Sequence, residues 1–199
     1  MDGMIGQSEQ LVDEILVMDC QSGSSQALDL LVSRWQKRLW RYACRLTGNS
    51  EAAWEVTQES WLGIIRGIRR LNDPARFRAW AYRIVTNKSR DWIRKKAGRA
   101  TSQTDEPIES PPQNGPQTNE TSADLETILG RLSERNRTVL TLHYLEEFGI
   151  AEIAKIMRVP KGTVKSRLHT ARAEFKRLWQ AMDEGAQTDA SVAQKGEPK

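Results

Sequence analysis

Residues 150–178, IAEIAKIMRVPKGTVKSRLHTARAEFKRL, have the most informative pattern in the chain. The first eight of these residues place apolar side chains three or four positions apart, which predicts a short amphipathic helix. Pro160 prevents this helix from simply continuing, and a longer basic helix is expected from Gly162 to about Leu178. A short helix, a tight turn and a basic helix are typical of a helix-turn-helix, whose second helix enters the major groove of DNA.

The longer helix separates an inward apolar stripe from an outward polar face. On a helical wheel the stripe consists of Val164, Leu168, Ala171, Phe175 and Leu178. The opposite face has small or hydrogen-bonding side chains with cations along its edges, which suits base reading between two phosphate backbones. A merely solvated basic face is the alternative, but the preceding helix and turn, and the scarcity of acids, favour DNA. The predicted DNA contacts of this helix are Lys161, Thr163, Lys165, Ser166, Arg167, His169, Thr170, Arg172 and Lys176.

The helix-turn-helix closes a predicted domain at residues 124–180. Ser133 is expected to cap a helix that runs to Leu145, and His143 within that helix is predicted to be structural. Residues 98–123 are polar and acidic with few large apolar side chains, so a flexible linker is expected there. Residues 181–199 are expected to form a disordered tail.

Helical periodicity also marks a first domain at residues 25–97, preceded by an N-terminal segment, residues 1–24, with a short helix. The expected boundaries are a start at Ser25, an end at Gly48, a cap at Asn49 or Ser50, and a break at Asn72, Asp73 and Pro74. The apolar residues that mark the second helix are Trp54, Trp61, Leu62 and Ile65, and its two tryptophans are expected in the core or at an interface. The predicted inward positions of the third helix are Phe77, Ala81, Ile84 and Trp92. The predicted fold is therefore all-α, with two small helical domains joined by a flexible acidic linker.

Positive charge gathers in the first domain although the whole chain has a net charge of only +4. Between Arg66 and Arg99 there are twelve lysines and arginines against Asp73 and Asp91, which predicts a polyanion-binding surface. An aromatic ring among cations suits bases that leave the duplex. Trp80 lies nearer the inward side, where a core role and a DNA wedge both remain open. The predicted DNA contacts of this domain are Arg69, Arg70, Asn72, Arg76, Trp80, Tyr82, Arg83, Thr86, Asn87, Arg90 and Arg94.

Composition and motifs exclude several other classes. The two cysteines, Cys20 and Cys44, are too few and too far apart for a disulfide scaffold or a Cys-x-x-Cys metal site. No signal-peptide core or membrane span is apparent, so we expect a cytoplasmic protein without membrane insertion. There is no Gly-rich phosphate loop and no recognisable nucleophile pair, so we expect no enzymatic activity, no cofactor and no metal.

Two motifs resemble a known family. Leu132-Ser133-Glu134-Arg135, Glu152-Ile153-Ala154 and Gly162-Thr163-Val164-Lys165-Ser166-Arg167-Leu168 resemble region four of bacterial sigma factors. Glu55-Val56-Thr57-Gln58-Glu59-Ser60-Trp61 resembles the polymerase-binding helix of region two, and residues 77–94 resemble its promoter-melting helix. The linker stands where larger sigma factors have region three, so the resemblance implies the extracytoplasmic-function (ECF) branch.

The resemblance implies a promoter-recognition subunit of RNA polymerase. Glu55, Gln58 and Glu59 would bind the clamp helices of the largest polymerase subunit, and they share one helix face at i, i+3 and i+4. The second domain would contact the flap of the second-largest subunit and read the minus-thirty-five element. The first domain would recognise and melt the minus-ten element. An anti-sigma factor is a further partner that the resemblance implies.

Four residues depart from the family pattern. Ala52 stands where an Asp is usual, Ser133 where a Pro is common, and Thr170 where an Arg often contacts DNA. Arg158 occupies a turn position that is often Gly, and a positive φ there would cost about 1 kcal/mol.

Linker length predicts how the free protein is arranged. A flexible linker of about 26 residues spans roughly 28 Å, whereas promoter elements about sixteen base pairs apart are separated by roughly 55 Å. We therefore expect the free protein to keep its domains close and the polymerase to hold them apart. The alternative function is a helix-turn-helix regulator of the response-regulator type that binds duplex DNA without polymerase, which would need a receiver domain or ligand pocket.

Overall fold

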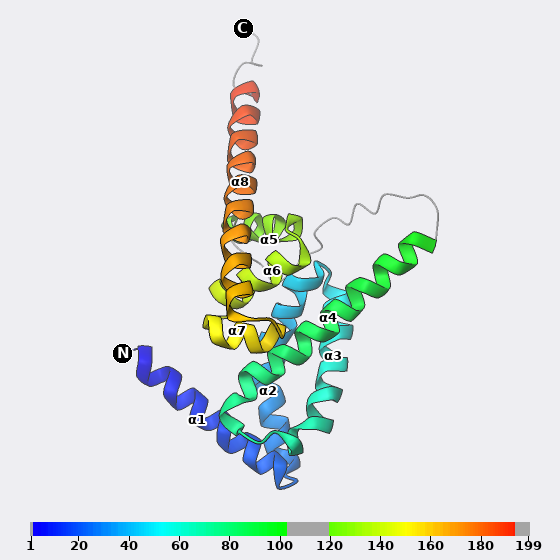
Figure 1. The fold of residues 1–199 in the computed structure, drawn as a ribbon, viewed down its shortest axis with the longest axis vertical. Helices are drawn as coiled ribbons and strands as arrows, with labels where there is room; N and C mark the ends of the chain where they lie inside the picture. The colour runs from blue at the N-terminus through cyan, green and yellow to red at the C-terminus, as the bar shows by residue number, and fades with distance from the viewer. Residues whose placement is uncertain (1, 103–119, 194–199) are drawn as a thin grey trace.

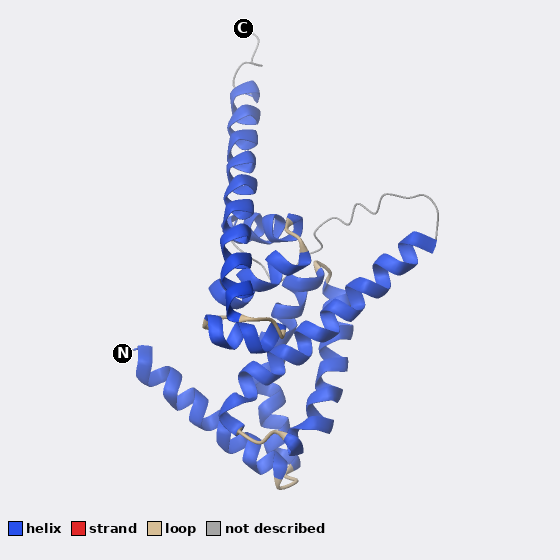
Figure 2. Cartoon of the chain, viewed as in Figure 1, coloured by secondary structure: helices blue, strands red, loops and turns tan. Residues whose placement is uncertain are grey.

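The structure, a computed structural model, describes the backbone of residues 2–102 and 120–193, and side chains within 8–98 and 124–183. Every regular element in these ranges is a helix (Figure 2). The predicted all-α class is therefore confirmed. The linker residues 103–119 and the tail residues 194–199 lie outside the described residues.

The first domain is a bundle of four helices and two short 3₁₀ turns. Ser24 caps α2 through Ala27 N (3.2 Å), and Asn49, one of the two residues expected to cap α3, does so through Ala52 N (2.8 Å). Gly48 ends α2 in the left-handed region at φ 66°, as predicted. The elements are α1 (Asp2–Gln21), α2 (Ser25–Thr47), α3 (Ser50–Gly67), η1 (Ile68–Arg70), η2 (Pro74–Arg76) and α4 (Phe77–Ser102).

The second domain builds the predicted helix-turn-helix. Ser133 caps α6, and Arg158, between α7 and α8, has φ 54°, so the strain expected at this turn is present. His143 Nδ1 lies 3.2 Å from the Phe148 carbonyl oxygen, which fits its predicted structural role. The elements are α5 (Glu120–Arg131), α6 (Glu134–Leu140), the π-helical turn η3 (Thr141–Leu145), α7 (Ile150–Met157) and α8 (Lys161–Ala193).

Several predicted boundaries need correction. α1 is longer than the short helix expected, α4 continues to Ser102 and α5 begins at Glu120, so helix enters both ends of the predicted linker. α8 does not end near Leu178 but continues to Ala193, through part of the predicted tail. No proline interrupts residues 161–193, and alanines and other good helix formers are frequent there, which favours this extension.

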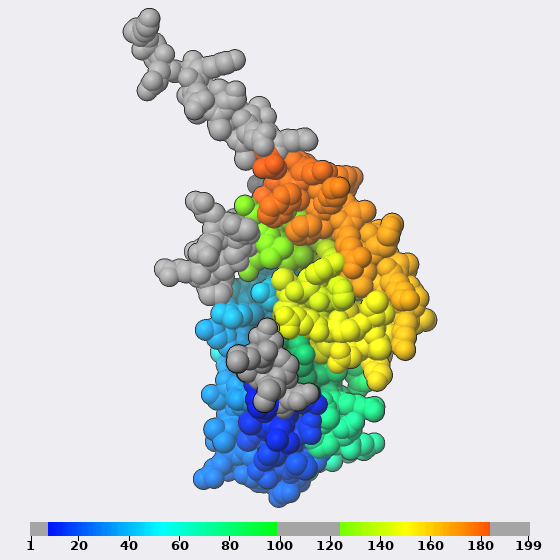
Figure 3. All heavy atoms as spheres, turned by 90° about the vertical axis from the view of Figure 1, so that its left-hand side faces the viewer, coloured from blue at the N-terminus to red at the C-terminus, as the bar shows by residue number. Residues whose placement is uncertain are grey.

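The two domains pack against each other. α7 lies against α4, and α6 and α5 meet α2 (Figure 1). The space-filling view shows the second domain, yellow to orange, directly on the first (Figure 3). The close arrangement expected from the linker length is therefore the one that the structure has.

Candidate nucleic-acid interface

The outward face of α8 is accessible as predicted. Val164, Leu168 and Ala171 are buried, and Phe175 and Leu178 pack partly against the core. On the other side Lys165, Ser166, His169, Thr170 and Arg172 are exposed, as are Lys161 and Lys176. Arg167 and Thr163 are half-buried at the edges. The helix therefore presents small polar groups between cations, the arrangement that can read base edges between phosphates.

The loop between α3 and α4 carries a second exposed cluster. Arg69, Arg70, Asn72 and Arg76 are all exposed, on and beside η1 and η2. Asp73 accepts from Ala75 N (3.2 Å) and pairs with Arg76 (2.7 Å), which holds the turn into α4. The loop thus offers cations and an amide to a polyanion.

The outer face of α4 differs from the prediction at two residues. Tyr82 and Thr86, expected to face DNA, have exposed fractions of 1% and 0%. The Tyr82 ring packs between Tyr42 (4.8 Å between centroids) and Phe148 (5.0 Å), and the Thr86 hydroxyl lies 2.8 Å from the Tyr42 hydroxyl. The expectation of exposure was wrong because α4 is covered on two sides, by α2 and α3 on one and by the second domain on the other.

The other predicted residues of α4 are partly accessible. Arg83 and Asn87 are half-buried, and Arg94 is exposed beside Asp91 (2.9 Å). Arg90 is paired with Glu134 of the second domain at 3.0 Å. Ile84 and Trp92, predicted to point inward, are only half-buried against the core. Part of this cationic face is therefore engaged by the second domain.

Trp80 is half-buried and rests on the backbone of α3. A Cβ added at Gly67 would lie 2.9 Å from the Trp80 ring, so only glycine leaves room for this contact. The Phe77 ring is 6.2 Å away. Trp80 therefore has a packing role, and its accessible part lies close to the η1–η2 loop.

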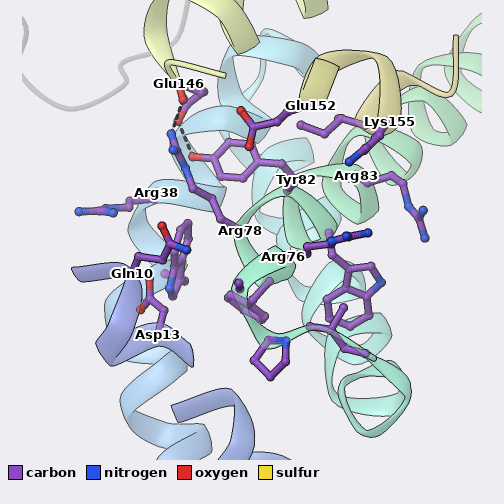
Figure 4. A pocket seen from close by; sticks show the side chains of 18 of the residues that line it. Gln10, Asp13, Arg38, Arg76, Arg78, Tyr82, Arg83, Glu146, Glu152 and Lys155 are labelled. Atoms are coloured by element: carbon purple, nitrogen blue, oxygen red, sulfur yellow. Dashed lines mark hydrogen bonds between the residues drawn. The ribbon is translucent and has the colours of Figure 1, made fainter. Parts of the chain in front are cut away.

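Glu146 is the centre of the contact between the domains, and sequence reasoning missed it. Its carboxylate accepts from Arg45 (2.9 Å) and from the Tyr82 hydroxyl, and Arg78 donates to its backbone carbonyl (Figure 4). The Arg78 guanidinium also lies over the Phe148 ring, 4.3 Å from its centroid. Burial raises the pKa of the Glu146 carboxyl above its usual value, although Tyr82 and the two arginines act in the opposite direction.

Beside this cluster lies an open groove of about 1000 Å³. Arg38, Arg76 and Arg83 approach it from the first domain and Lys155 from the second, with Asp13 and Gln10 on the α1 side (Figure 4). Its walls carry both signs of charge. No sequence motif pointed to the groove, because residues from four distant segments form it.

The predicted polymerase-binding residues of α3 are accessible, but one of them is paired with a lysine of α4. Glu55 and Gln58 are exposed, whereas Glu59 pairs with Lys88 (2.8 Å), whose hydrogen bond lowers the pKa of the Glu59 carboxyl. Leu62 and Ile65, two of the apolar residues that marked this helix, are 53% and 43% exposed, and Trp54, expected in the core or at an interface, is 47% exposed. Ala53, Val56 and Ile64 lie on the buried face of α3 instead. These exposed apolar side chains lie on the same arc of α3 as Glu55 and Gln58.

The described residues include no candidate membrane span and no candidate metal site. None of the helices in the described ranges is long and apolar enough to cross a bilayer. Within the same ranges no group of three potential metal ligands occurs, and the two cysteines are free.

Comparisons with known proteins match both domains. The family described as Sigma-70 region 2 matches residues 31–99, and Sigma-70, region 4 matches residues 122–175. The ECF RNA polymerase sigma-E factor of Haemophilus influenzae is 30% identical over 178 residues, covering 83% of this chain and 94% of the relative. The factor of the same name from Escherichia coli K12 is also 30% identical, with coverages of 83% and 93%.

Solved structures agree with these matches. CnrH, in complex with the cytosolic domain of CnrY, is 26% identical, with a TM-score of 0.65 and coverage of 85% of this chain and 98% of that chain. The sigma factor RpoE of Bartonella quintana, in complex with the anti-sigma factor NepR, is 20% identical with a TM-score of 0.68, covering 77% and 96%, and supports the fold. Where a response regulator would need a receiver domain, this chain matches Sigma-70 region 2, which argues against the alternative function.

Proposed function

Because the chain belongs to the ECF sigma factors, we propose that it binds core RNA polymerase and directs initiation by reading one promoter element with each domain. The observation that carries this proposal is the outward face of α8. It has exposed Ser166, His169 and Thr170 between exposed cations, behind a short helix and a turn. α8 reads the minus-thirty-five duplex with this face. The contacting residues are Lys161, Thr163, Lys165, Ser166, Arg167, His169, Thr170, Arg172 and Lys176.

The first domain recognises and melts the minus-ten element. Arg69, Arg70, Asn72 and Arg76 extend from the η1–η2 loop into solvent, where they can hold a phosphate backbone and receive a base that has left the stack. Arg83, Asn87, Arg90 and Arg94 continue this surface along α4, with Trp80 at its edge. Tyr82 is not part of it while the domains are packed together, and Thr86 is buried against Tyr42 within the first domain.

The polymerase binds α3 at its exposed, mixed face. Glu55, Gln58 and Glu59 attract the basic clamp helices of the largest subunit. Trp54 and Leu62 add exposed apolar area to the same arc, which is what a stable interface needs at its centre. The second domain meets the flap of the second-largest subunit.

Binding to the polymerase separates the two domains. With the domains packed together, Arg90 is paired with Glu134 and the α7 side of α4 is covered. Both promoter elements can be reached only when the domains move apart. The free energy of binding to the polymerase and to DNA offsets the cost of breaking the hydrogen bonds and the ion pair around Glu146.

The protein acts in the cytoplasm, where the polymerase and the chromosome are, and has no enzymatic activity of its own. An anti-sigma factor is a further partner. The solved structure of the sigma factor RpoE in complex with the anti-sigma factor NepR supports a search for such a partner.

Reconstitution with bacterial core RNA polymerase tests the proposal. The full chain is mixed with the core enzyme and a pool of templates randomised over both promoter elements, and the transcripts are sequenced. We expect two enriched elements separated by a fixed spacing. If no complex forms at moderate salt, or no sequence is enriched, the proposed function is wrong.

A further inference from the structure

The side chain of Gln21, the last residue of α1, binds the loop that carries the exposed cations of the first domain. Its Nε2 atom donates to the carbonyl oxygen of Ile68 at 3.0 Å and to that of Leu71 at 2.8 Å. The bonds join residues 47 and 50 positions apart, and the Gln21 side chain is part-buried. The terminal amide of one helix therefore joins both ends of η1.

η1 alternates between anchored and exposed residues. Ile68 is buried and Leu71 is half-buried against the core, whereas Arg69 and Arg70 between them point into solvent. The backbone bond from Leu71 N to Ile68 O (3.1 Å) closes the turn, and the Gln21 amide lies across the same two residues. The amide thus fixes the direction in which the two arginines and the following Asn72 leave the loop.

The C-terminal end of α1 is adapted to this contact. Gly23 has φ 99° and turns the chain sharply after Gln21. A Cβ at Gly23 would lie 3.7 Å from the Arg69 guanidinium, so Arg69 passes directly over this turn. α1 also packs against both η1 and η2.

We propose that Gln21 is a positioning residue for reading the minus-ten element, an inference that rests on the proposed function of the first domain. Gln21 does not touch the DNA. By donating both amide hydrogens to the loop it holds Arg69, Arg70 and Asn72 in the arrangement that discriminates the unstacked base. A loop held in one arrangement cannot rearrange to accommodate other bases, so its base selectivity depends on this contact.

Selectivity measured in the reconstituted transcription assay tests the inference. Gln21→Met removes both donors at similar length, and Gln21→Glu places a carboxylate against two carbonyl oxygens. Each hydrogen bond contributes roughly a two- to tenfold factor, so we expect base discrimination at the minus-ten element to fall by about tenfold. Discrimination at the minus-thirty-five element and binding to core polymerase are expected to stay unchanged.

Gln10→Met is the matched control. Gln10 lies on the same helix, is exposed and donates only within α1, to Glu14 (2.9 Å), so its replacement is expected to leave both selectivities unchanged. Gln21→Lys returns donors at a similar reach and is expected to recover part of the discrimination. It also keeps the test decisive if Gln21→Glu does not fold.

A purely structural role would lower transcription from every template by the same factor. Equal losses at both elements, or unchanged discrimination in Gln21→Met and Gln21→Lys, would therefore overturn the inference. If the wild-type chain selects no promoter element, the proposed function fails and the inference fails with it. If the wild type selects both elements and the variants do not differ from it, only the inference fails.

Discussion

The outward face of α8 and the outer face of α4 carry similar cationic and polar side chains, but different parts of them are accessible. On α8, Lys165, Ser166 and His169 are exposed with the domains packed together. On α4, Tyr82 is buried under Phe148, and Arg90 is paired with Glu134. The difference indicates that the surface proposed to read the upstream element is accessible while the domains are packed together, whereas part of the surface proposed for the downstream element is covered by the second domain.

Glu146 lies at the contact between the two domains, which covers part of the outer face of α4. It lies in the segment just before α7, and its partners Arg45 and Tyr82 lie on α2 and α4. When one partner of a largely buried, hydrogen-bonded charge is removed, the remaining groups lose their partner. Each single substitution in this cluster is therefore expected to be strongly destabilising. The contrast between the two faces can therefore be tested at this residue first.

The largest effect is expected from Glu146→Ala, which leaves Arg45 and the Tyr82 hydroxyl unpaired and separates the domains. Cys44, near Glu126 of α5, reports this opening: burial first and Glu126 second raise the pKa of its thiol to about 11, from a usual value of 9.0. A return to the usual pKa increases the thiolate fraction at neutral pH about a hundredfold, and the lower nucleophilicity of the less basic thiolate reduces the expected acceleration of its reaction with a disulfide reagent to about tenfold. The rate is measured in a Cys20→Ala background.

Glu147→Ala is the control for this experiment, because the neighbouring Glu147 is exposed. It is expected to leave the Cys44 rate unchanged. If Cys44 reacts as slowly in Glu146→Ala as it does with Glu146 present, the Glu146 carboxylate does not hold the domains together.

Tyr82→Phe is expected to have the next largest effect. It keeps the ring between Tyr42 and Phe148 but removes the donor to Glu146, so the free energy of unfolding should fall by about 1.5–3 kcal/mol. Urea unfolding measures the change, with Tyr144→Phe as control because Tyr144 is 52% exposed. Unchanged stability would show that the hydrogen bond from the Tyr82 hydroxyl to Glu146 does not stabilise the contact between the domains.

Lys165→Ala tests the α8 side of the comparison. Lys165 is exposed at the edge of the recognition face, and its removal should weaken binding of the holoenzyme to the minus-thirty-five element by about tenfold. Ser166→Ala should instead change the base preferred there. Anisotropy with labelled promoter duplexes measures both, and binding to core polymerase should not change. Equal affinities for all duplexes would remove α8 from upstream recognition.

The smallest effect is expected at the turn of the helix-turn-helix. Arg158 has φ 54°, so Arg158→Gly should raise the free energy of unfolding by about 1 kcal/mol. Lys155→Gly, at an exposed position inside α7, should lower it by a similar amount. Thermal unfolding of the two variants distinguishes them. A destabilised Arg158→Gly would show that the arginine makes a contact that outweighs its backbone strain.

Local patterns predicted local structure well. Helix caps at Asn49 and Ser133, the left-handed end at Gly48 and the apolar stripe of α8 depend on residues close together in sequence, and all are present. The outer face of α4 could not be predicted in the same way. A helical wheel identifies one buried side, whereas Tyr82 lies where α4 is also covered by Phe148 of the other domain, and Thr86 is buried against Tyr42 of α2.

By itself the sequence determined the helices, their order, the helix-turn-helix and the family, since these follow from periodicity, capping and motifs that involve neighbouring residues. Only the tertiary structure decided which arginines and lysines are exposed and which pair with residues of the other domain. Arg45, Arg78 and Tyr82 meet Glu146 only because two domains pack together, and Gln21 meets η1 only because α1 folds back on it. Contacts between residues so distant in the chain depend on packing in three dimensions, which leaves no periodic trace in the sequence.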